Sequence, residues 1–313
     1  MKLVFNGINS GLGNNGGSRT ILIASQILES LGHRCDIIAN VDNFKWFEHK
    51  PTIDFLPDDV DAIINIAAID YATTRQLNVP IKAGWWRGHE IWANEEAYLG
   101  KCYRDVEVKN IVNSKGLKQL LATFDAESKV VYQGVDFDWW EDKKIRLNDK
   151  IRIGCLYNKK PTKRWEDFVK LAEILGTTDY EYVGIGDTYR DDEFLTYFFA
   201  NANVKELNNI YSSCHIWFSP TVLEGLHNVP LEAALCGCLL VGNDSQKNGM
   251  IYDYLFDGKT GMVYPSENVH AAAELIKNPN WELVSKAEAF IKEHIGTKKD
   301  NMKKMIKTLE TLI

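Results

Sequence analysis

The sequence has no run of about 18 apolar residues, the length that a membrane-spanning helix requires. Its first residues, Met1–Phe5, lead directly into a turn and so indicate a first strand and not a signal peptide. We therefore expect a cytoplasmic protein, and peripheral contact with the inner membrane face stays open.

Cysteine is scarce and scattered. The six cysteines form no C-x-x-C pair and have no histidine at a metal-ligand spacing. Cys236 and Cys238 flank Gly237, where packing explains them better than metal ligation. We expect small buried thiols in a reducing compartment, and no zinc site.

An excess of basic residues is also missing. The net charge is −7, and both halves of the chain share the acidic excess. Proteins that bind a phosphate backbone need clustered Lys and Arg. Nucleic acid is therefore a disfavoured partner, and a modified-DNA acceptor remains a minority alternative.

The chain does contain two successive series of alternating strand and helix patterns. With 313 residues, of which 45% are apolar, it is long enough for two domains. We predict an α/β fold with domains at residues 1–140 and 141–297, and a hinge at Trp139–Lys150. The pattern also predicts a helix over Asp192–Phe199 and a last helix over 298–313. Residues 41–60 are predicted to be a lid or acceptor loop, or a short amphipathic helix.

The most informative stretch is Ser219–Gly237. A predicted strand, His215–Phe218, precedes a Gly-containing turn and then a helix with Pro230 in its first turn, where the missing N–H has no partner to lose. The free N–H groups and positive dipole of such a helix start favour a phosphate. Glu224 in the turn can face a bound sugar, while Glu232, about two turns along, can reach a ribose.

The run from Glu224 to Ala233 resembles the E-x7-E motif of retaining nucleotide-sugar glycosyltransferases with the GT-B fold, most of all glycosyltransferase family 4. The resemblance extends from Leu3 to Val263. It implies two Rossmann-like domains whose parallel sheets face a central cleft, with the donor on the C-terminal domain and the last helix returned to the N-terminal one. It implies that Glu224 holds the transferred sugar and that Glu232 binds the ribose.

Further donor-binding residues follow from the same resemblance. A Gly-Gly pair opens the first helix, where no Cβ blocks the approach of the donor phosphate. Cys155 stands where an Arg is expected, so Lys159 is a candidate replacement, and Lys163 or Arg164 resembles the Lys that stabilises the departing diphosphate. The other candidates are Gly16, Gly17, Gly184, Gly186, Val204, Gly225, Leu226, His227 and Asn228.

A second candidate catalytic position follows the predicted strand Ile81–Trp86. The residues Gly88-His89-Glu90-Ile91-Trp92 resemble a Gly-x-Glu-x-Trp pattern of related enzymes, and strand C-terminal ends are where α/β sheets bind ligands. His89 is the candidate group beside the anomeric centre or the acceptor, with Glu90 second. A purely structural histidine is the alternative.

The resemblance implies transfer with retention, without a cofactor or a metal, from a UDP-, GDP- or ADP-sugar. The acceptor would be a glycan, a lipid or a small molecule. Two other functions stay open. One is a non-catalytic nucleotide- or sugar-binding protein on the same scaffold. The other is an NAD-dependent oxidoreductase, because Gly11–Gly16 contains G-x-G-x-x-G, although Asp36 lies at the start of the predicted second strand and not at its end.

Overall fold

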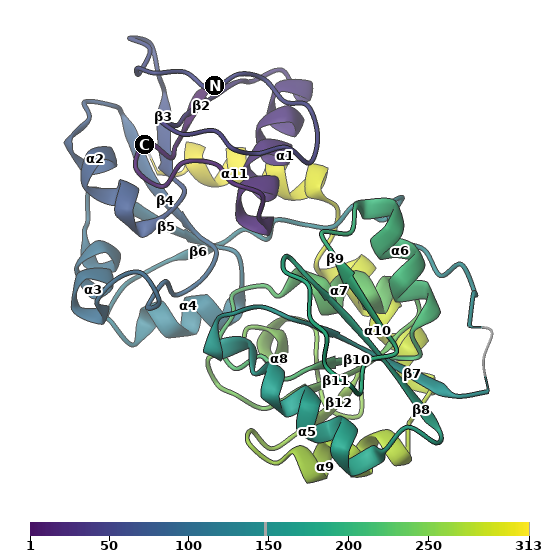
Figure 1. The fold of residues 1–313 in the computed structure, drawn as a ribbon. Helices are drawn as coiled ribbons and strands as arrows, with labels where there is room; N and C mark the ends of the chain where they lie inside the picture. Colours follow the sequence, from purple (N-terminus) through teal and green to yellow (C-terminus); the bar gives the residue numbers. More distant parts are fainter. Residues whose placement is uncertain (147–148, 313) are drawn as a thin grey trace. The chain divides into compact units, whose positions relative to one another are not determined.

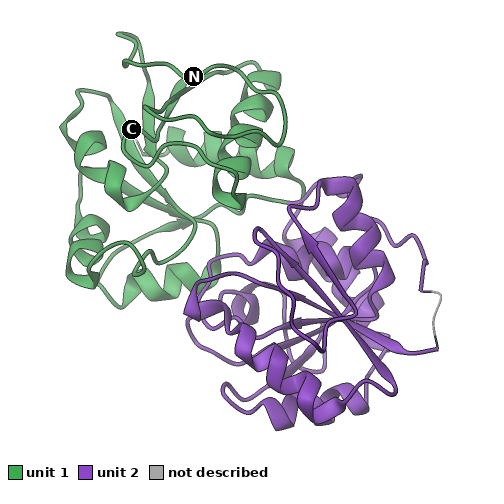
Figure 2. Cartoon of the chain, viewed as in Figure 1, with its two compact units in different colours: residues 1–134, 297–313 green, residues 135–296 purple. Residues whose placement is uncertain are grey.

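The computed structural model describes residues 1–146 and 149–312. The chain divides into two compact units, residues 1–134 with 297–313 and residues 135–296 (Figure 2). Residues 147–148, which belong to the predicted hinge, lie outside the described residues. Ile313, the last residue of the predicted final helix, lies outside them as well. Within the described residues, no helix has the length and apolarity that crossing a membrane demands.

The first unit is built on a six-stranded sheet of order β2-β1-β3-β4-β5-β6, and every neighbouring pair is parallel (Figure 1). Its elements are β1 Lys2–Asn6, α1 Gly16–Ser30, β2 Arg34–Ile38, β3 Ala62–Asn65, a 3-10 turn at Ala68–Asp70, α2 Tyr71–Gln76, β4 Ile81–Trp86, α3 Glu96–Arg104, β5 Lys109–Val112, α4 Lys115–Ala122, β6 Lys129–Val130 and α11 Lys298–Glu310. Most residues of these strands are buried and apolar, as in parallel strands covered on both faces, and the polar ones stand mainly at or next to strand ends.

The last helix, α11, is part of the core of this unit. Its buried side chains, Met302, Met305, Ile306 and Leu309, belong to the same apolar cluster as α1 and the sheet. The chain enters α11 beside Gly134, whose φ is +71° and whose missing Cβ would lie 2.5 Å from the Lys298 nitrogen. Only glycine combines that backbone angle with so close an approach.

The second unit repeats the arrangement, with a parallel sheet of order β12-β11-β10-β7-β8-β9. Its elements are β7 Ile151–Leu156, a 3-10 turn at Pro161–Lys163, α5 Trp165–Leu175, β8 Tyr180–Gly186, β9 Tyr197–Ala200, α6 Val204–Ser213, β10 Ile216–Ser219, α7 Asn228–Leu235, β11 Leu239–Asn243, α8 Met250–Asp253, β12 Met262–Tyr264, α9 Val269–Lys277 and α10 Glu282–His294. The predicted α/β architecture with two parallel sheets is confirmed.

One prediction of local structure is wrong, and a second segment follows one of its two predicted alternatives. The segment predicted as a helix over Asp192–Phe199 is a turn followed by β9, which pairs with β8. Aromatic residues favour strands, and Phe198 fits over Gly184 on the neighbouring strand. Residues 41–60 form a loop and not the alternative short helix, and Phe44 is buried in the core of the first unit. A role of this loop as a lid or acceptor site stays a prediction.

The placement of α11 gives a stability prediction. Met305→Ala removes a fully buried side chain and leaves a cavity, so it should lower the free energy of unfolding of the first unit by about 2–5 kcal/mol. Lys303→Ala, on the exposed face of the same helix, should change it by less than about 0.5 kcal/mol. Urea unfolding of both variants measures the difference. Equal effects would mean that α11 does not pack as described.

Candidate active site

The Ser219–Gly237 stretch forms a loop between a central strand and a helix. Strand β10 ends at Ser219, the chain turns through residues 220–227, and α7 begins at Asn228 with His227 at its N-cap position. Pro230 lies in the first turn of α7, as predicted. The C-terminal edge of the sheet and the positive end of a helix therefore meet at this loop.

Two buried asparagines hold the loop in place. The Asn243 amide donates to the carbonyls of Pro220, at 2.7 Å, and Thr221, at 3.0 Å, and the Asn248 amide donates to Thr221 at 2.8 Å. The backbone of Glu224 also pairs with residues 247–249. These contacts satisfy carbonyls that would otherwise be buried without partners. Sequence reasoning missed both asparagines, although a buried strand that ends in Asn243 could have indicated a polar partner for the loop.

Glu224 forms an ion pair with Lys163 at this edge. Lys163 ends the 3-10 turn after β7, and the Val222 N–H donates to the Thr162 carbonyl at 2.9 Å, which ties that turn to the loop. The side chains of Lys163 and Glu224 are only 10% and 23% exposed. Burial by itself would raise the pKa of Glu224, but the Lys163 ammonium outweighs it and holds the pKa below the ordinary value.

The structure separates the three candidate cations. Arg164, in a left-handed conformation before α5, pairs with Asp167 through Nε at 2.8 Å. Lys159 is exposed. Of the three, Lys163 is the one that lies against Glu224.

His227 is a buried neighbour of this pair. Its Nδ1 is 3.3 Å from both Ser219 Oγ and Met250 Sδ, and its carbonyl accepts a 2.6 Å hydrogen bond from the Tyr254 hydroxyl. Its Nε2 is buried and finds no hydrogen-bond partner among the described residues. Burial and the nearby Lys163 ammonium lower the pKa of His227 to about 3, so the imidazole is neutral at physiological pH.

Glu232 is the fifth residue of α7, at the start of its second turn, and is buried. The Tyr211 hydroxyl of α6 donates to Glu232 Oε2 at 3.4 Å. Tyr211 also packs against Trp140, with 5.6 Å between ring centroids. The Tyr211 hydroxyl thus orients the Glu232 carboxylate, and Trp140 packs against the Tyr211 ring. The sequence patterns had indicated neither aromatic residue.

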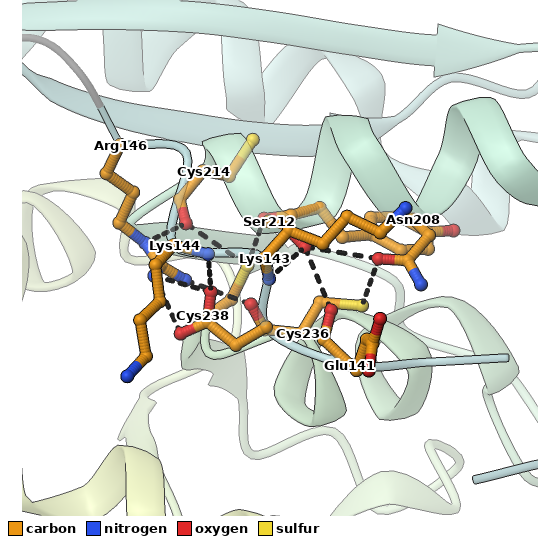
Figure 3. A network of polar contacts seen from close by, with 11 residues as sticks. Glu141, Lys143, Lys144, Arg146, Asn208, Ser212, Cys214, Cys236 and Cys238 are labelled. Atoms are coloured by element: carbon orange, nitrogen blue, oxygen red, sulfur yellow. Dashed lines mark hydrogen bonds and ion pairs between the residues drawn. The ribbon is translucent and has the colours of Figure 1, made fainter. Parts of the chain in front are cut away.

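The segment that contains Trp140 continues as a polar network behind α6 and α7 (Figure 3). Arg146 donates to the carbonyls of Cys214 at 2.9 Å and Cys236 at 3.0 Å, so it satisfies carbonyls at the ends of both helices. Ser212 donates to the Glu141 carbonyl at 3.1 Å. This network fixes α6 against α7, and hence Tyr211 against Glu232. All six cysteines of the chain are buried free thiols, as predicted.

The remaining donor-binding candidates of this unit lie at strand and helix ends. Leu226 and Gly225 are buried in the loop, and Asn228 is the first residue of α7. Val204 is the first residue of α6, whose N-cap Asn203 forms a capping box. Gly184 and Gly186 end β8, where an added Cβ would meet Phe198 or the Tyr157 carbonyl, so packing alone already requires their small size.

In the first unit, Gly16 and Gly17 open α1 behind the N-cap Asn15. The guanidinium of Arg87 donates to the carbonyls of Gly17 and Ile66, both at 2.5 Å. Burial lowers the pKa of Arg87 to about 10, which still leaves it charged. Arg87 therefore places a positive charge beside the Gly-Gly helix start, and sequence reasoning passed over it.

The structure places His89 in the interior of the first unit, which favours the structural alternative, and its contact with a sugar stays a prediction. His89 has no exposed surface; its Nδ1 is 3.1 Å from the Tyr103 hydroxyl, and its ring packs against Phe124. An aromatic interior of this kind explains the histidine without a ligand. Glu90 is half-buried and accepts from the Ala68 N–H at 3.0 Å, so it supports the turn that follows β3.

Residues 153–278 match the family model for glycosyl transferases group 1. That match supports a glycosyltransferase domain in the second unit. It covers β7 to α9, and so the loop with Glu224, Lys163 and Glu232. No curated protein sequence matches the chain.

Solved structures extend the likeness to the whole chain. The chain is similar to sucrose-phosphate synthase from Thermosynechococcus elongatus, with a TM-score of 0.79 and 13% identity over 100% of this chain and 99% of that one. It is similar to Anabaena HepE in complex with UDP and glucose, with a TM-score of 0.78 and 13% identity over 99% and 100%. It is also similar to a glycosyltransferase from Rickettsia africae, with a TM-score of 0.75 and 13% identity over 99% of this chain and 98% of that one. At identities this low, structural similarity establishes the fold alone. That similarity confirms the predicted two-domain GT-B fold.

The neutral His227 predicts a pH dependence of stability. Its pKa is lower in the folded than in the unfolded chain, so the unfolded chain binds the extra proton and stability falls as the pH drops below about 6.5. Between pH 7.5 and 5 this one group should cost about 2 kcal/mol, and His227→Asn should reduce the pH-dependent loss by that amount.

The readout is the urea unfolding free energy of the second unit at both pH values. The exposed His270→Asn in α9 is the matched control and should leave the pH-dependent loss as in the parent protein. An unchanged loss in His227→Asn would contradict the burial of a neutral imidazole.

Proposed function

We propose that the protein is a retaining glycosyltransferase that moves a sugar from a nucleotide-sugar to an acceptor without a metal. The observation that supports this most is the largely buried Lys163–Glu224 pair at the loop before α7, with Glu232 in the second turn of that helix, within the residues that match the glycosyl transferases group 1 model. The loop before α7 would then supply a carboxylate for sugar hydroxyls, α7 a second carboxylate for a ribose, and the 3-10 turn after β7 a cation for a phosphate.

The chemistry follows from these charges. As the sugar leaves, the nucleoside diphosphate gains negative charge, and a fixed ammonium stabilises that charge more than the ground state. Lys163 is held in place by Glu224 and by its 3-10 turn, so it needs no reorganisation during the reaction. The positive end of α7 adds to the same field. In a retaining reaction the departing phosphate takes the proton of the acceptor hydroxyl, and the protein then needs no dedicated base.

We propose a UDP-sugar as the donor to test first. The structures of HepE were solved with UDP, with UDP and glucose, and with UDP-glucose, which makes uridine the first base to examine. GDP- and ADP-sugars are the comparison set. The acceptor, a glycan, a lipid or a small molecule, would bind the first unit.

The two carboxylates should differ in their effects. Glu232→Ala should weaken UDP binding about 10-fold to 100-fold, because it removes charge-assisted hydrogen bonds to the ribose. Glu224→Gln should leave the UDP dissociation constant within about threefold but lower turnover of the UDP-sugar about 100-fold, because its contacts tighten as the sugar departs.

Calorimetry gives the binding constants, and release of UDP from the UDP-sugar gives turnover. Glu173→Ala, an exposed carboxylate on α5, is the control and should behave as the parent protein. Small and equal effects of the two substitutions would sink the assignment. Binding without any turnover would favour the non-catalytic alternative.

Tyr211 should act as a positioning residue. Tyr211→Phe removes the hydroxyl that orients Glu232 and keeps the ring that packs on Trp140. We expect the KM for the UDP-sugar to rise about threefold to tenfold while kcat changes less than twofold, because one neutral hydrogen bond contributes about 1 kcal/mol. Tyr189→Phe, with its exposed ring, is the matched control. A fall in kcat with unchanged KM would contradict this role.

A further inference from the structure

The first unit contains a cavity that the proposed reaction does not use. It lies between α2 and α3, the two helices that follow β3 and β4, and Figure 1 shows them along the same side of the unit. The helices run back from the C-terminal edge of a parallel sheet, so they end at the opposite edge. Arg75 and Gln76 end α2, and Lys101 and Arg104 end α3. The cavity is therefore at the edge away from Gly17 and Arg87.

The cavity is large enough for a small molecule. Its volume is about 590 Å³, within the range of roughly 300–1,000 Å³ that ligand sites have. It is lined by Tyr71, Ala72, Arg75, Gln76, Tyr98, Lys101, Arg104 and Asp105.

The lining is positive on a protein whose net charge is −7. Arg75 neutralises the one carboxylate, because its Nε donates to Asp105 Oδ2 at 2.7 Å. Asp105 also accepts from the Tyr71 hydroxyl. Lys101 and Arg104 are exposed, and neither forms an ion pair with a carboxylate in the part of the chain that the structure describes. Two cations thus remain to meet an anion.

Two further lysines strengthen the field at this edge. Lys82 at the start of β4 donates to the Arg75 carbonyl at 2.8 Å, and Lys109 at the start of β5 donates to the Val106 carbonyl at 2.7 Å. Both ammonium groups donate to neutral backbone carbonyls, and these contacts do not cancel their charges. Glu107, 3.1 Å from Arg75, is the opposing carboxylate just outside the cavity. The positive charges outnumber the negative ones.

The tyrosines give the cavity an apolar wall. Tyr71 and Tyr98 meet edge to face with centroids 6.4 Å apart. Their hydroxyls are already engaged, Tyr71 with Asp105 and Tyr98 with the Ala68 carbonyl at 3.2 Å. The rings therefore offer faces and edges to a ligand, and planar or apolar groups pack well against them. An anionic group next to such a body would satisfy the cations and the rings together.

We propose that this cavity is a binding site for an organic phosphate, in which Lys101 and Arg104 hold the phosphate and Tyr71 and Tyr98 contact the body that carries it. The site is separate from the donor site and does not depend on the proposed function. The phosphate can come from a soluble metabolite or from a lipid headgroup, and the two sources are distinguished by experiment.

The test uses the full chain with phenyl phosphate, inorganic phosphate and vesicles of phosphatidylglycerol in phosphatidylcholine. Calorimetry should show phenyl phosphate binding at least about fivefold more tightly than inorganic phosphate, because only the former reaches the rings. Lys101→Glu with Arg104→Glu should weaken phenyl phosphate at least about tenfold. Tyr98→Ala should remove the preference for the phenyl group. Lys118→Glu, an equally exposed lysine on α4, should change nothing.

Several outcomes would overturn the proposal. One is the absence of binding of all three probes. Another is binding that the double variant does not weaken, or that UDP displaces, since the anion would then occupy a different site. The unliganded thermal unfolding temperature of each variant confirms that it folds. Flotation with vesicles that is lost in the double variant, together with no binding of phenyl phosphate, would support the same cations with a lipid headgroup as the source.

Discussion

The ion pair between Lys163 and Glu224 is the constraint around which the second unit is organised. Two charges that are mostly removed from water are costly unless each has the other close by, so both supporting loops must be held accurately. Strands β7 and β10 are neighbours in the sheet, with Ile153 opposite Ile216, and the loops that follow them therefore emerge side by side. The backbone hydrogen bond from Val222 to Thr162 joins these loops directly. The sheet order thus brings together two residues 61 positions apart.

The accuracy of this pair depends on groups that touch neither charge. Asn243 and Asn248 bind the carbonyls of Pro220 and Thr221, so the loop cannot shift without leaving buried polar atoms unpaired. On the other side of α7, Arg146 binds carbonyls at the ends of α6 and α7. The helix is thereby fixed at its start by the loop and at its end by the segment before β7. Glu224, in the loop before the helix, and Glu232, in its second turn, are therefore both held on a rigid support.

Much of this arrangement could be predicted from the sequence, and the limits have physical causes. The alternation of apolar strands and amphipathic helices predicted two parallel sheets, and the spacing of Glu224, Pro230 and Glu232 predicted a helix start between the carboxylates. The choice among Lys159, Lys163 and Arg164 could not be made, because it depends on a left-handed residue and a 3-10 turn that propensity does not specify. The strand that ends in Asn243 indicates a polar group, but the carbonyls that Asn243 and Asn248 bind could not be identified, because these partners are distant in sequence. The burial of His89 depends on Tyr103 and Phe124, contributed by later segments.

The neutral state of His227 completes the electrostatics of the site. Lys163 and Glu224 cancel as formal charges, and the positive end of α7 and the nearby Lys160 ammonium make the field at the loop positive. A protonated His227 would add a second buried cation beside Lys163, and burial together with that repulsion is what keeps its pKa near 3. The field at the loop is therefore positive without a second buried cation beside Lys163, whose removal from water would be costly. Because the imidazole beside the pair is neutral, Lys163 and Glu224 are each paired with a charge of opposite sign, which offsets the cost of removing them from water.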